Sequence, residues 1–162
     1  MRIIIIGAGD IGYNLAKMLS YEQHDIYLIE KDQEKCARAA DTLDAHVLRG
    51  SGTSMTVLEH VGIREADLVV AVTNSDEANL VSVISAKHYG VGKTIARVKN
   101  REFLRTDAPI NAQKFDIDLI IHPESVAAQG AVRLLKQTAA TDFIEFAKGQ
   151  IIVMGIQLDR EE

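Results

Sequence analysis

The stretch RIIIIGAGDIG, residues 2–12, decides the fold. Its four consecutive isoleucines favour a pleated strand over a helix, because the branched Cβ restricts their side chains. No polar residue alternates with them, so we expect this strand to be covered on both faces, as in a parallel sheet. Three glycines follow, and apolar residues from Ile11 to Leu19, Met18 among them, then recur at helical spacing. The stretch therefore predicts a buried strand, a tight turn and an amphipathic helix.

The three glycines fit the pattern G-x-G-x-x-G between a strand and a helix, the context in which that pattern is informative. Gly7 permits the tight turn, Gly9 leaves the backbone open to a pyrophosphate, and Gly12 lets the helix lie close to the strand. The N-terminus of the helix then offers N–H groups and a partial positive charge to a phosphate. The turn predicts a nucleotide site, and the alternative is an ordinary tight turn between strand and helix.

An acidic residue follows the second strand pattern. Residues 26–29 are apolar or aromatic and end in Glu30, about 20 residues beyond the glycine turn, where a ribose-binding carboxylate is expected. Its two oxygens suit a pair of ribose hydroxyls, and its charge would repel a 2′-phosphate. The sequence therefore predicts NAD or another adenosine nucleotide in preference to NADP. In the alternative interpretation Glu30 is simply solvated.

Strand and helix patterns continue to alternate along the chain. Further strands are expected at 45–48, 68–72, 94–98 and 119–121, and further helices at 33–43, 54–61, 75–89, 111–115 and 124–137. This alternation predicts an α/β fold with a doubly wound parallel six-stranded sheet of the Rossmann type, in the order 3-2-1-4-5-6. After residue 142 two short strand patterns predict a C-terminal β-hairpin extension. We expect a nucleotide-binding domain at 1–138, and at 139–162 a hairpin or linker that begins a missing C-terminal domain.

Polar residues follow the fourth strand, beside the glycine turn in this topology. Thr73, Asn74 and Ser75 offer hydroxyls, an amide and backbone N–H groups to a phosphate or a second ribose. The alternative is that they only cap the next helix, since Asn74 with Glu77 resembles a capping box. That helix is expected to turn Val81 inward, among other apolar residues.

Other polar residues follow the third and fifth strands. Ser51 and Thr53 lie in a Gly-Ser-Gly-Thr turn that topology places near an adenine on the Glu30 side, or that forms a plain loop. Arg97 ends the fifth strand, where it reaches a phosphate or a neighbouring subunit. For Arg97 the alternative is a solvated or ion-paired side chain.

Composition and length exclude several classes of protein. The net charge is −5 and no Lys/Arg cluster stands out, so nucleic acid is not expected as a main partner. Cys36 is the single cysteine and cannot form an internal disulfide, which fits a reducing compartment. No apolar run approaches the roughly 20 residues that span a bilayer, so we expect a cytoplasmic chain with no direct membrane insertion. The five histidines show no metal-ligand spacing, and we expect no metal site.

The same observations argue against catalysis. A hydride-transfer enzyme needs a substrate pocket with an acid or base over the nicotinamide, usually from a second domain, and 162 residues leave no room for a complete one. The chain is therefore expected to hold a nucleotide without being an enzyme and to have no catalytic residues. Two alternatives remain: an NAD-dependent dehydrogenase fragment, and an S-adenosylmethionine methyltransferase, which also uses a glycine loop and a strand-end acid.

Longer segments of the chain point to one family. They are IIIIGAGDIGYNLA, IYLIEKD, VLRGSGT, LEHVGIREADLVVAVTNSDEAN, IARVKN and IIHPESVAAQ, over about residues 1–137. Together they resemble the KTN (RCK) N-terminal domain of TrkA-type potassium-uptake proteins, and the fourth segment is the most specific because generic dehydrogenases lack it. The tail DFIEFAKGQIIVMGIQL is similar to the start of that family's C-terminal ligand-sensing domain. Since such proteins often repeat the domain pair, we expect the chain to be part of a longer protein.

The resemblance implies a cytoplasmic regulatory subunit at the inner face of the membrane. It would bind NAD(H), or alternatively ATP/ADP, and gate a membrane-embedded potassium channel or transporter of the TrkH/KtrB kind. It would form a homo-oligomer, a dimer or a higher ring, through the helix at 124–137, which could instead pack on its own sheet. By position, the resemblance assigns nucleotide binding to Gly7, Gly9, Asp10, Ile11, Gly12, Glu30, Lys31, Ser51, Thr53, Thr73, Asn74, Ser75, Arg97 and Lys99.

The chain departs from the family pattern at two places. The family often has Asp where Glu30 stands, and we expect the longer acid to shift the ribose. It also often has Asp or His between the two glycines where this chain has Ser51, which affects the adenine side.

Overall fold

The structure, a computed structural model, describes residues 1–105, 113–136, 142–146 and 151–155. Contacts divide the chain into two compact units, Met1–His122 and Pro123–Glu162. The domain boundary expected at residue 138 stays a prediction. No helix of the described ranges is long and apolar enough to cross a membrane.

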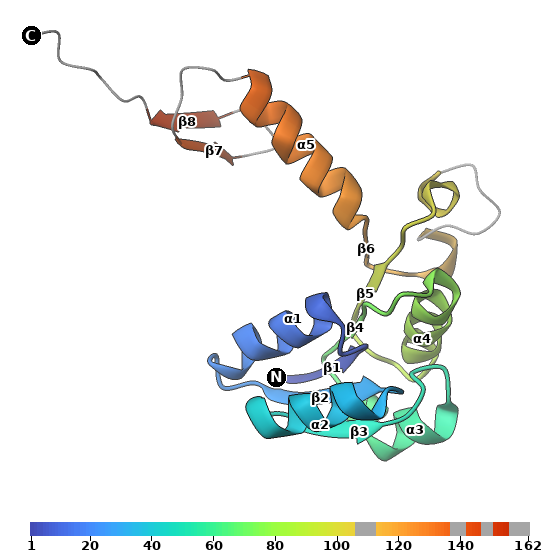
Figure 1. Ribbon diagram of the computed structural model, residues 1–162. Helices are drawn as coiled ribbons and strands as arrows, with labels where there is room; N and C mark the ends of the chain where they lie inside the picture. The colour runs from blue at the N-terminus through green and yellow to red at the C-terminus, as the bar shows by residue number, and fades with distance from the viewer. Residues whose placement is uncertain (106–112, 137–141, 147–150, 156–162) are drawn as a thin grey trace, which may run out of the picture. The chain divides into compact units, whose positions relative to one another are not determined.

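The first unit is built on a parallel sheet of six strands in the order β3-β2-β1-β4-β5-β6 (Figure 1). The strands are β1 (Arg2–Ile6), β2 (Asp25–Glu30), β3 (His46–Arg49), β4 (Leu68–Ala71), β5 (Lys93–Arg97) and β6 (Leu119–Ile121). All neighbouring pairs are parallel, and β1 lies between β2 and β4. The predicted fold class and strand order are confirmed. The topology reverses beside β1, so ligand is expected over the carboxyl ends of β1 and β4.

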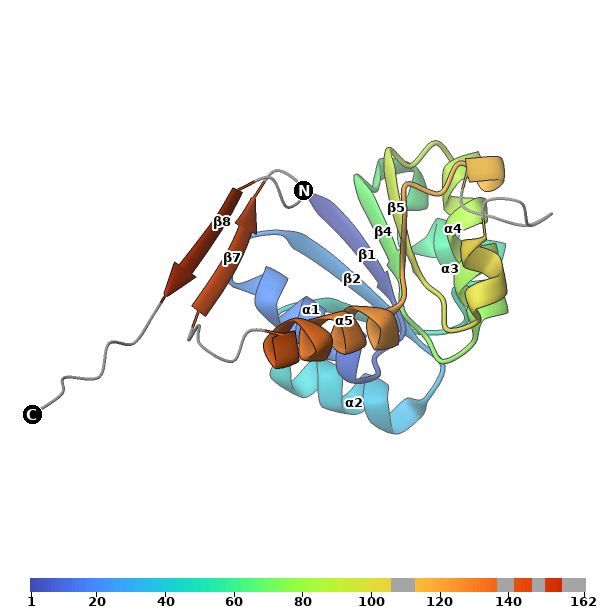
Figure 2. The same cartoon turned by 90° about the horizontal axis from the view of Figure 1, so that it is seen from above.

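Helices connect the strands and cover both faces of the sheet (Figure 2). They are α1 (Asp10–Ser20), α2 (Gln33–Thr42), α3 (Met55–His60) and α4 (Asp76–His88), with short 3-10 turns η1 (Ile63–Glu65), η2 (Arg101–Leu104) and η3 (Gln113–Phe115). Residues 111 and 112 of the helix expected at 111–115 lie outside the described part of the chain. Buried residues of α1 and α2 pack in one core, and those of α3 and α4 in the other.

The isoleucine run of β1 feeds both cores. Successive strand residues point to opposite faces, so Ile4 and Ile6 join the core under α3 and α4. Ile3 and Ile5 join the core under α1 and α2. All four are at most 2% exposed, which explains why the run has no polar alternation.

Two expectations about the helices are wrong. Asn74 does not cap α4; the cap is Ser75, whose Oγ accepts the N–H of Ala78 at 3.1 Å. The hydroxyl one residue later has the reach that the amide was expected to supply. Met18 and Val81 are 67% and 45% exposed rather than inward, because neighbouring positions of their helices already face the sheet.

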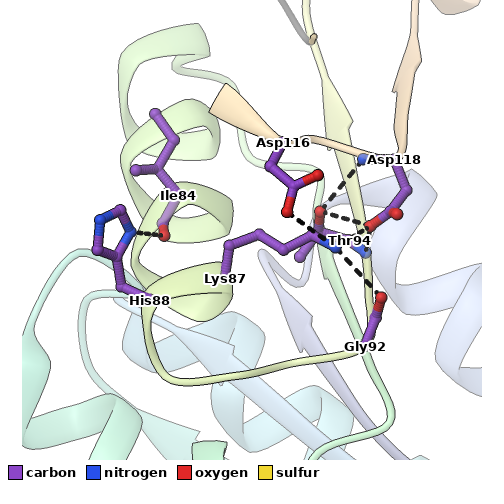
Figure 3. A network of polar contacts seen from close by, with 7 residues as sticks. All are labelled: Ile84, Lys87, His88, Gly92, Thr94, Asp116 and Asp118. Atoms are coloured by element: carbon purple, nitrogen blue, oxygen red, sulfur yellow. Dashed lines mark hydrogen bonds and ion pairs between the residues drawn. The ribbon is translucent and has the colours of Figure 1, made fainter. Parts of the chain in front are cut away.

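Polar contacts fix the edge of the sheet at the amino ends of β5 and β6 (Figure 3). The Lys87 ammonium lies 2.7 Å from Asp118 Oδ2 and donates to the Gly92 carbonyl at 3.2 Å. The same Asp118 oxygen accepts the N–H of Thr94 at 2.7 Å and its hydroxyl at 3.1 Å. The hydrogen bond from Lys87 is the main reason that the pKa of Asp118 lies below its ordinary value. These contacts tie the short strand β6 to α4 and β5.

The second unit contains α5 (Pro123–Lys136) and an antiparallel strand pair, β7 (Asp142–Phe146) and β8 (Ile151–Gly155). The pair is the predicted C-terminal hairpin, with Phe146 opposite Ile151. On α5, Val126 and Val132 are 65% and 48% exposed.

Candidate nucleotide-binding site

A pocket of about 260 Å³ lies where β1, β2, β3 and β4 end. Its lining consists of Ile6, Gly7, Gly9, Ile29, Glu30, Lys31, Lys35, Gly50, Ser51, Gly52, Val72, Thr73, Asn74, Ser75, Ala78 and Ser82. Eight residues predicted from the sequence are therefore brought together here, from four loops. The other six predicted residues, Asp10, Ile11, Gly12, Thr53, Arg97 and Lys99, lie outside this lining.

The glycine turn has the geometry that its pattern predicts. Gly7 has a φ of +103°, which L side chains rarely adopt, and a Cβ there would come within 3.1 Å of Thr73. A Cβ at Gly12 would lie 1.8 Å from the Gly7 carbonyl oxygen, so only glycine lets α1 approach β1 this closely. At Gly9, by contrast, no atom of the described residues lies within 4 Å of an added Cβ. The turn is closed at its two ends and open at its middle.

The open middle of the turn leads into the N-terminus of α1. Gly9 is the N-cap of this helix, and no side chain of the described residues caps it. The first N–H groups of a helix lack partners within the helix and carry a partial positive charge. Asp10 and Ile11 form the start of that first turn behind Gly9. The arrangement provides an anion site that the protein's own side chains leave unfilled.

Glu30 holds the turn on the other side of the pocket. Its Oε2 accepts the N–H of Ala8 at 2.7 Å. Its Oε1 accepts the N–H groups of Lys31 and Asp32 at 2.7 and 3.0 Å. One carboxylate thus joins the end of β2 to the glycine turn and to the start of α2, and it is not simply solvated.

The third wall of the pocket is the β4–α4 loop, positioned by a residue that sequence reasoning missed. Asn79 is fully buried, and its Oδ1 accepts the N–H and hydroxyl of Thr73 at 2.8 and 2.7 Å. Its Nδ2 donates to the carbonyls of Thr73 and Arg97 at 3.1 and 2.8 Å. This side chain therefore fixes Thr73 at the pocket edge and joins the ends of β4 and β5. The only sequence sign was a polar residue one position before the apolar Leu80.

The floor of the pocket requires small residues. A Cβ on Gly52 would lie 2.2 Å from Ile6 Cγ2 and 3.1 Å from Ser82 Oγ, so the third loop passes directly over β1 and α4. Ser51 and Thr53, on either side, contact each other through their hydroxyl oxygens at 2.8 Å. Ser82 is buried and donates to the Ala78 carbonyl at 2.7 Å. Ser82 was not predicted.

A family model of the TrkA-N domain matches residues 3–123. The chain belongs to the TrkA-N family. A Trk system potassium uptake protein TrkA homolog of Methanothermobacter thermautotrophicus is 37% identical over 158 residues, covering 98% of this chain and 71% of the relative. A second TrkA homolog, from Archaeoglobus fulgidus, is 37% identical over 159 residues, covering 98% of this chain and 36% of the relative. The chain therefore spans only part of the relatives it matches.

Solved structures share the fold of this TrkA-N chain. The TrkA-N domain of inner membrane protein ybaL from Escherichia coli has a TM-score of 0.70 at 17% identity, covering 83% of this chain and 96% of that one. The GsuK channel bound to NAD has a TM-score of 0.66 at 24% identity, covering 84% of this chain and 23% of that one. GsuK bound to ADP has a TM-score of 0.65 at 24% identity, covering 84% and 34%. At these identities the likeness shows the fold.

In this TrkA-N chain, Arg97 and Lys99 support the β4–α4 loop from behind. The N–H of Lys99 donates to both carboxylate oxygens of Asp76 at 3.0 Å, and its Nζ donates to the Asn74 carbonyl at 3.4 Å. The Arg97 carbonyl accepts from Asn79. Their predicted contact with phosphates stays a prediction, and what the structure gives them is a link to the loop that lines the pocket.

Two lysines stand beside Glu30 in the TrkA-N pocket. Lys31 was predicted; Lys35, in the first turn of α2, was not. Asp32 caps this helix by accepting the N–H of Lys35 at 3.0 Å. The thiol of Cys36 donates to the Glu30 carbonyl at 3.3 Å, and burial raises its pKa, so it stays protonated as a structural donor. Among the described residues, no group of three or more His, Cys, Asp or Glu could hold a metal ion.

Proposed function

We propose that this chain is the nucleotide-binding part of a regulatory subunit of a Trk/Ktr-type potassium uptake system. It binds NAD(H), or alternatively ATP or ADP, in the pocket over β1–β4. From the cytoplasmic side it gates a membrane-embedded potassium channel or transporter subunit of the TrkH/KtrB kind. The observation that carries the proposal is the glycine turn, which is open only at Gly9 and points the start of α1 into a pocket beside Glu30.

The pocket divides into subsites that suit a dinucleotide. The open backbone at Gly9 and the start of α1 suit the pyrophosphate. Glu30 suits the adenosine ribose, and Ser51 on the neighbouring loop suits the adenine side. The hydroxyl of Thr73, with the backbone beyond it, suits the other half of NAD or the outer phosphates of ATP.

The protein is proposed to regulate rather than to catalyse. Of the pocket-lining residues, Glu30 is the only carboxylate, and both of its oxygens are already engaged by backbone N–H groups. Regulation then works through conformation: each nucleotide stabilises the state of the assembly that it binds more tightly. The size of the response is limited by that difference in affinity.

Assembly is proposed to occur between copies of the chain, as a dimer or a higher ring. The support is α5, which exposes Val126 and Val132 along one helix of the second unit. Exposed apolar residues that repeat on one helix favour burial against a partner.

The test is calorimetric titration of the purified chain with NADH, ATP and ADP. In Gly9→Ala the added methyl group meets no described protein atom, so the melting temperature should stay within about 2 °C. The same methyl group stands where the pyrophosphate must approach, so affinity should fall by about tenfold or more.

The matched control is Gly92→Ala, where an added Cβ has only an ordinary contact, 3.7 Å from the Asp67 carbonyl oxygen. Gly92 is not among the residues that line the pocket, so this variant should bind like the parent chain. If the parent chain binds none of the three nucleotides, the proposal fails.

A further inference from the structure

The Glu30 carboxylate has little acceptor capacity left for a ligand. An ionised carboxylate offers about four acceptor positions, two on each oxygen. The N–H groups of Lys31 and Asp32 occupy both positions of Oε1. The N–H of Ala8 occupies one position of Oε2. One position, on Oε2, remains.

The backbone of Glu30 is fixed as firmly as its side chain. Its carbonyl accepts the N–H of Gly50 at 2.7 Å and the thiol of Cys36 at 3.3 Å. The adjacent Ile29 carbonyl accepts the N–H of Gly7 at 2.8 Å. Two successive N–H groups of the glycine turn, those of Gly7 and Ala8, are therefore bound to the end of β2. Turning the carboxylate to face two ribose hydroxyls would leave the Ala8 N–H without this partner.

We infer that Glu30 reads one hydroxyl of the adenosine ribose, and that it uses the rest of its acceptor capacity to position the glycine turn for the pyrophosphate. This inference rests on the proposed nucleotide binding and adds a specificity rule to it. One ribose position is recognised strictly, through the free position of Oε2. The other hydroxyl faces water or a neighbouring side chain, and its removal is tolerated.

Singly deoxygenated nucleotides test the rule. The parent chain is titrated with ATP, 2′-deoxy-ATP, 3′-deoxy-ATP and 2′,3′-dideoxy-ATP, and with NAD carrying the same changes in its adenosine ribose. One singly deoxygenated form should bind within about twofold of the intact nucleotide. The other, and the dideoxy form, should bind at least about tenfold more weakly, the effect of losing one hydrogen bond to a charged group.

The outcomes separate this inference from the proposed function. Equal weakening by both single changes would show a carboxylate that reads two hydroxyls, and would overturn the inference while nucleotide binding stands. No weakening by either change would show that Glu30 reads neither hydroxyl, and would likewise overturn the inference alone. Absence of binding by the intact nucleotides would instead remove the proposed function.

The positioning role is tested without any ligand. In Glu30→Gln the amide nitrogen cannot accept an N–H, so the side chain can no longer hold all three donors. Hydrogen exchange at the Ala8 amide should become at least about tenfold faster. Glu34→Gln is the matched control: it removes the same charge from the first turn of α2, outside the pocket lining, and should leave Ala8 unchanged. Unchanged exchange at Ala8 in Glu30→Gln would overturn the positioning role.

Discussion

At the scale of single residues, Asn79 shows how a buried polar group can shape a site that it does not line. Its amide oxygen accepts two hydrogen bonds and its amide nitrogen donates two, so its hydrogen-bonding capacity is filled. Three of the four contacts go to Thr73 and one crosses to the end of β5 at Arg97. The position of the pocket wall therefore depends on a side chain inside α4.

Replacing Asn79 should damage both stability and binding. Asn79→Ala leaves the N–H of Thr73 and the carbonyl of Arg97 without this partner in a buried setting, which should cost about 2–3 kcal/mol of unfolding free energy. Urea unfolding measures this loss, and titration with NADH should show weaker binding. Asn14→Ala, on the exposed face of α1, is the control and should change stability by less than about 0.5 kcal/mol. A loss in the control as large as in Asn79→Ala would contradict this account.

Spacing alone was enough to predict some residues of the site but not others. Gly7, Gly9 and Glu30 could be found because a strand, a turn and a second strand put them at fixed offsets. Asn79 and Ser82 could not, since a polar residue in a helical pattern normally indicates the solvent side. The backbone partners of Glu30 were also beyond reach, because they depend on how two loops meet.

At the scale of elements, the start of α4 organises the loop after β5. Asp76, the first residue of α4, accepts the N–H groups of Lys99 and Asn100 at 2.7–3.0 Å. The β4–α4 loop and the β5–η2 loop therefore move together. The alternation of patterns predicted the order of the strands, but the Ser75 cap and these cross-loop contacts appear only in three dimensions.

The opposite end of β5 gives a prediction for pH. Asp118→Asn removes the ion pair with Lys87 and should lower stability at neutral pH by about 1 kcal/mol, the size for a partly exposed pair. The pKa of Asp118 is lowered in the folded state, so its contribution is present above the ordinary value of 3.8 and is lost as pH falls through the lowered pKa. Urea unfolding across this range should show the parent chain and the variant converging in acid.

The matched control for this pair is its neighbour. Asp116 lies 4.0 Å from the same Lys87 ammonium but is 90% exposed, so Asp116→Asn should have little effect at any pH. A gap between parent and Asp118→Asn that persists unchanged in acid would show that the carboxylate charge is not the cause.

At the scale of the whole molecule, hydrogen bonds connect the pocket wall to the end of the first unit. Lys99 contacts Asn74 through its ammonium and Asp76 through its N–H. Its carbonyl oxygen lies 2.8 Å from Nε2 of His122, which must carry the proton because a carbonyl only accepts. His122 is the last residue of the first unit, and α5 begins at the next residue.

This connection predicts a separation of binding from response. His122→Ala should keep nucleotide affinity within about twofold, because His122 is not among the pocket-lining residues. It should reduce the change in hydrogen exchange that NADH causes in α5, while the change in the pocket loops remains. His88→Ala, which loses only a contact to the Ile84 carbonyl within α4, is the control. An undiminished response of α5 in His122→Ala would exclude this route.

The empty space beside Gly9 also matters for genetics. A single methyl group there would leave the protein abundant, correctly assembled and insensitive to its metabolite, because it collides with the ligand and with nothing else described. A strain carrying that allele would retain the regulator and lose only its sensitivity, which distinguishes a cell that lacks the subunit from one whose subunit is present but unresponsive.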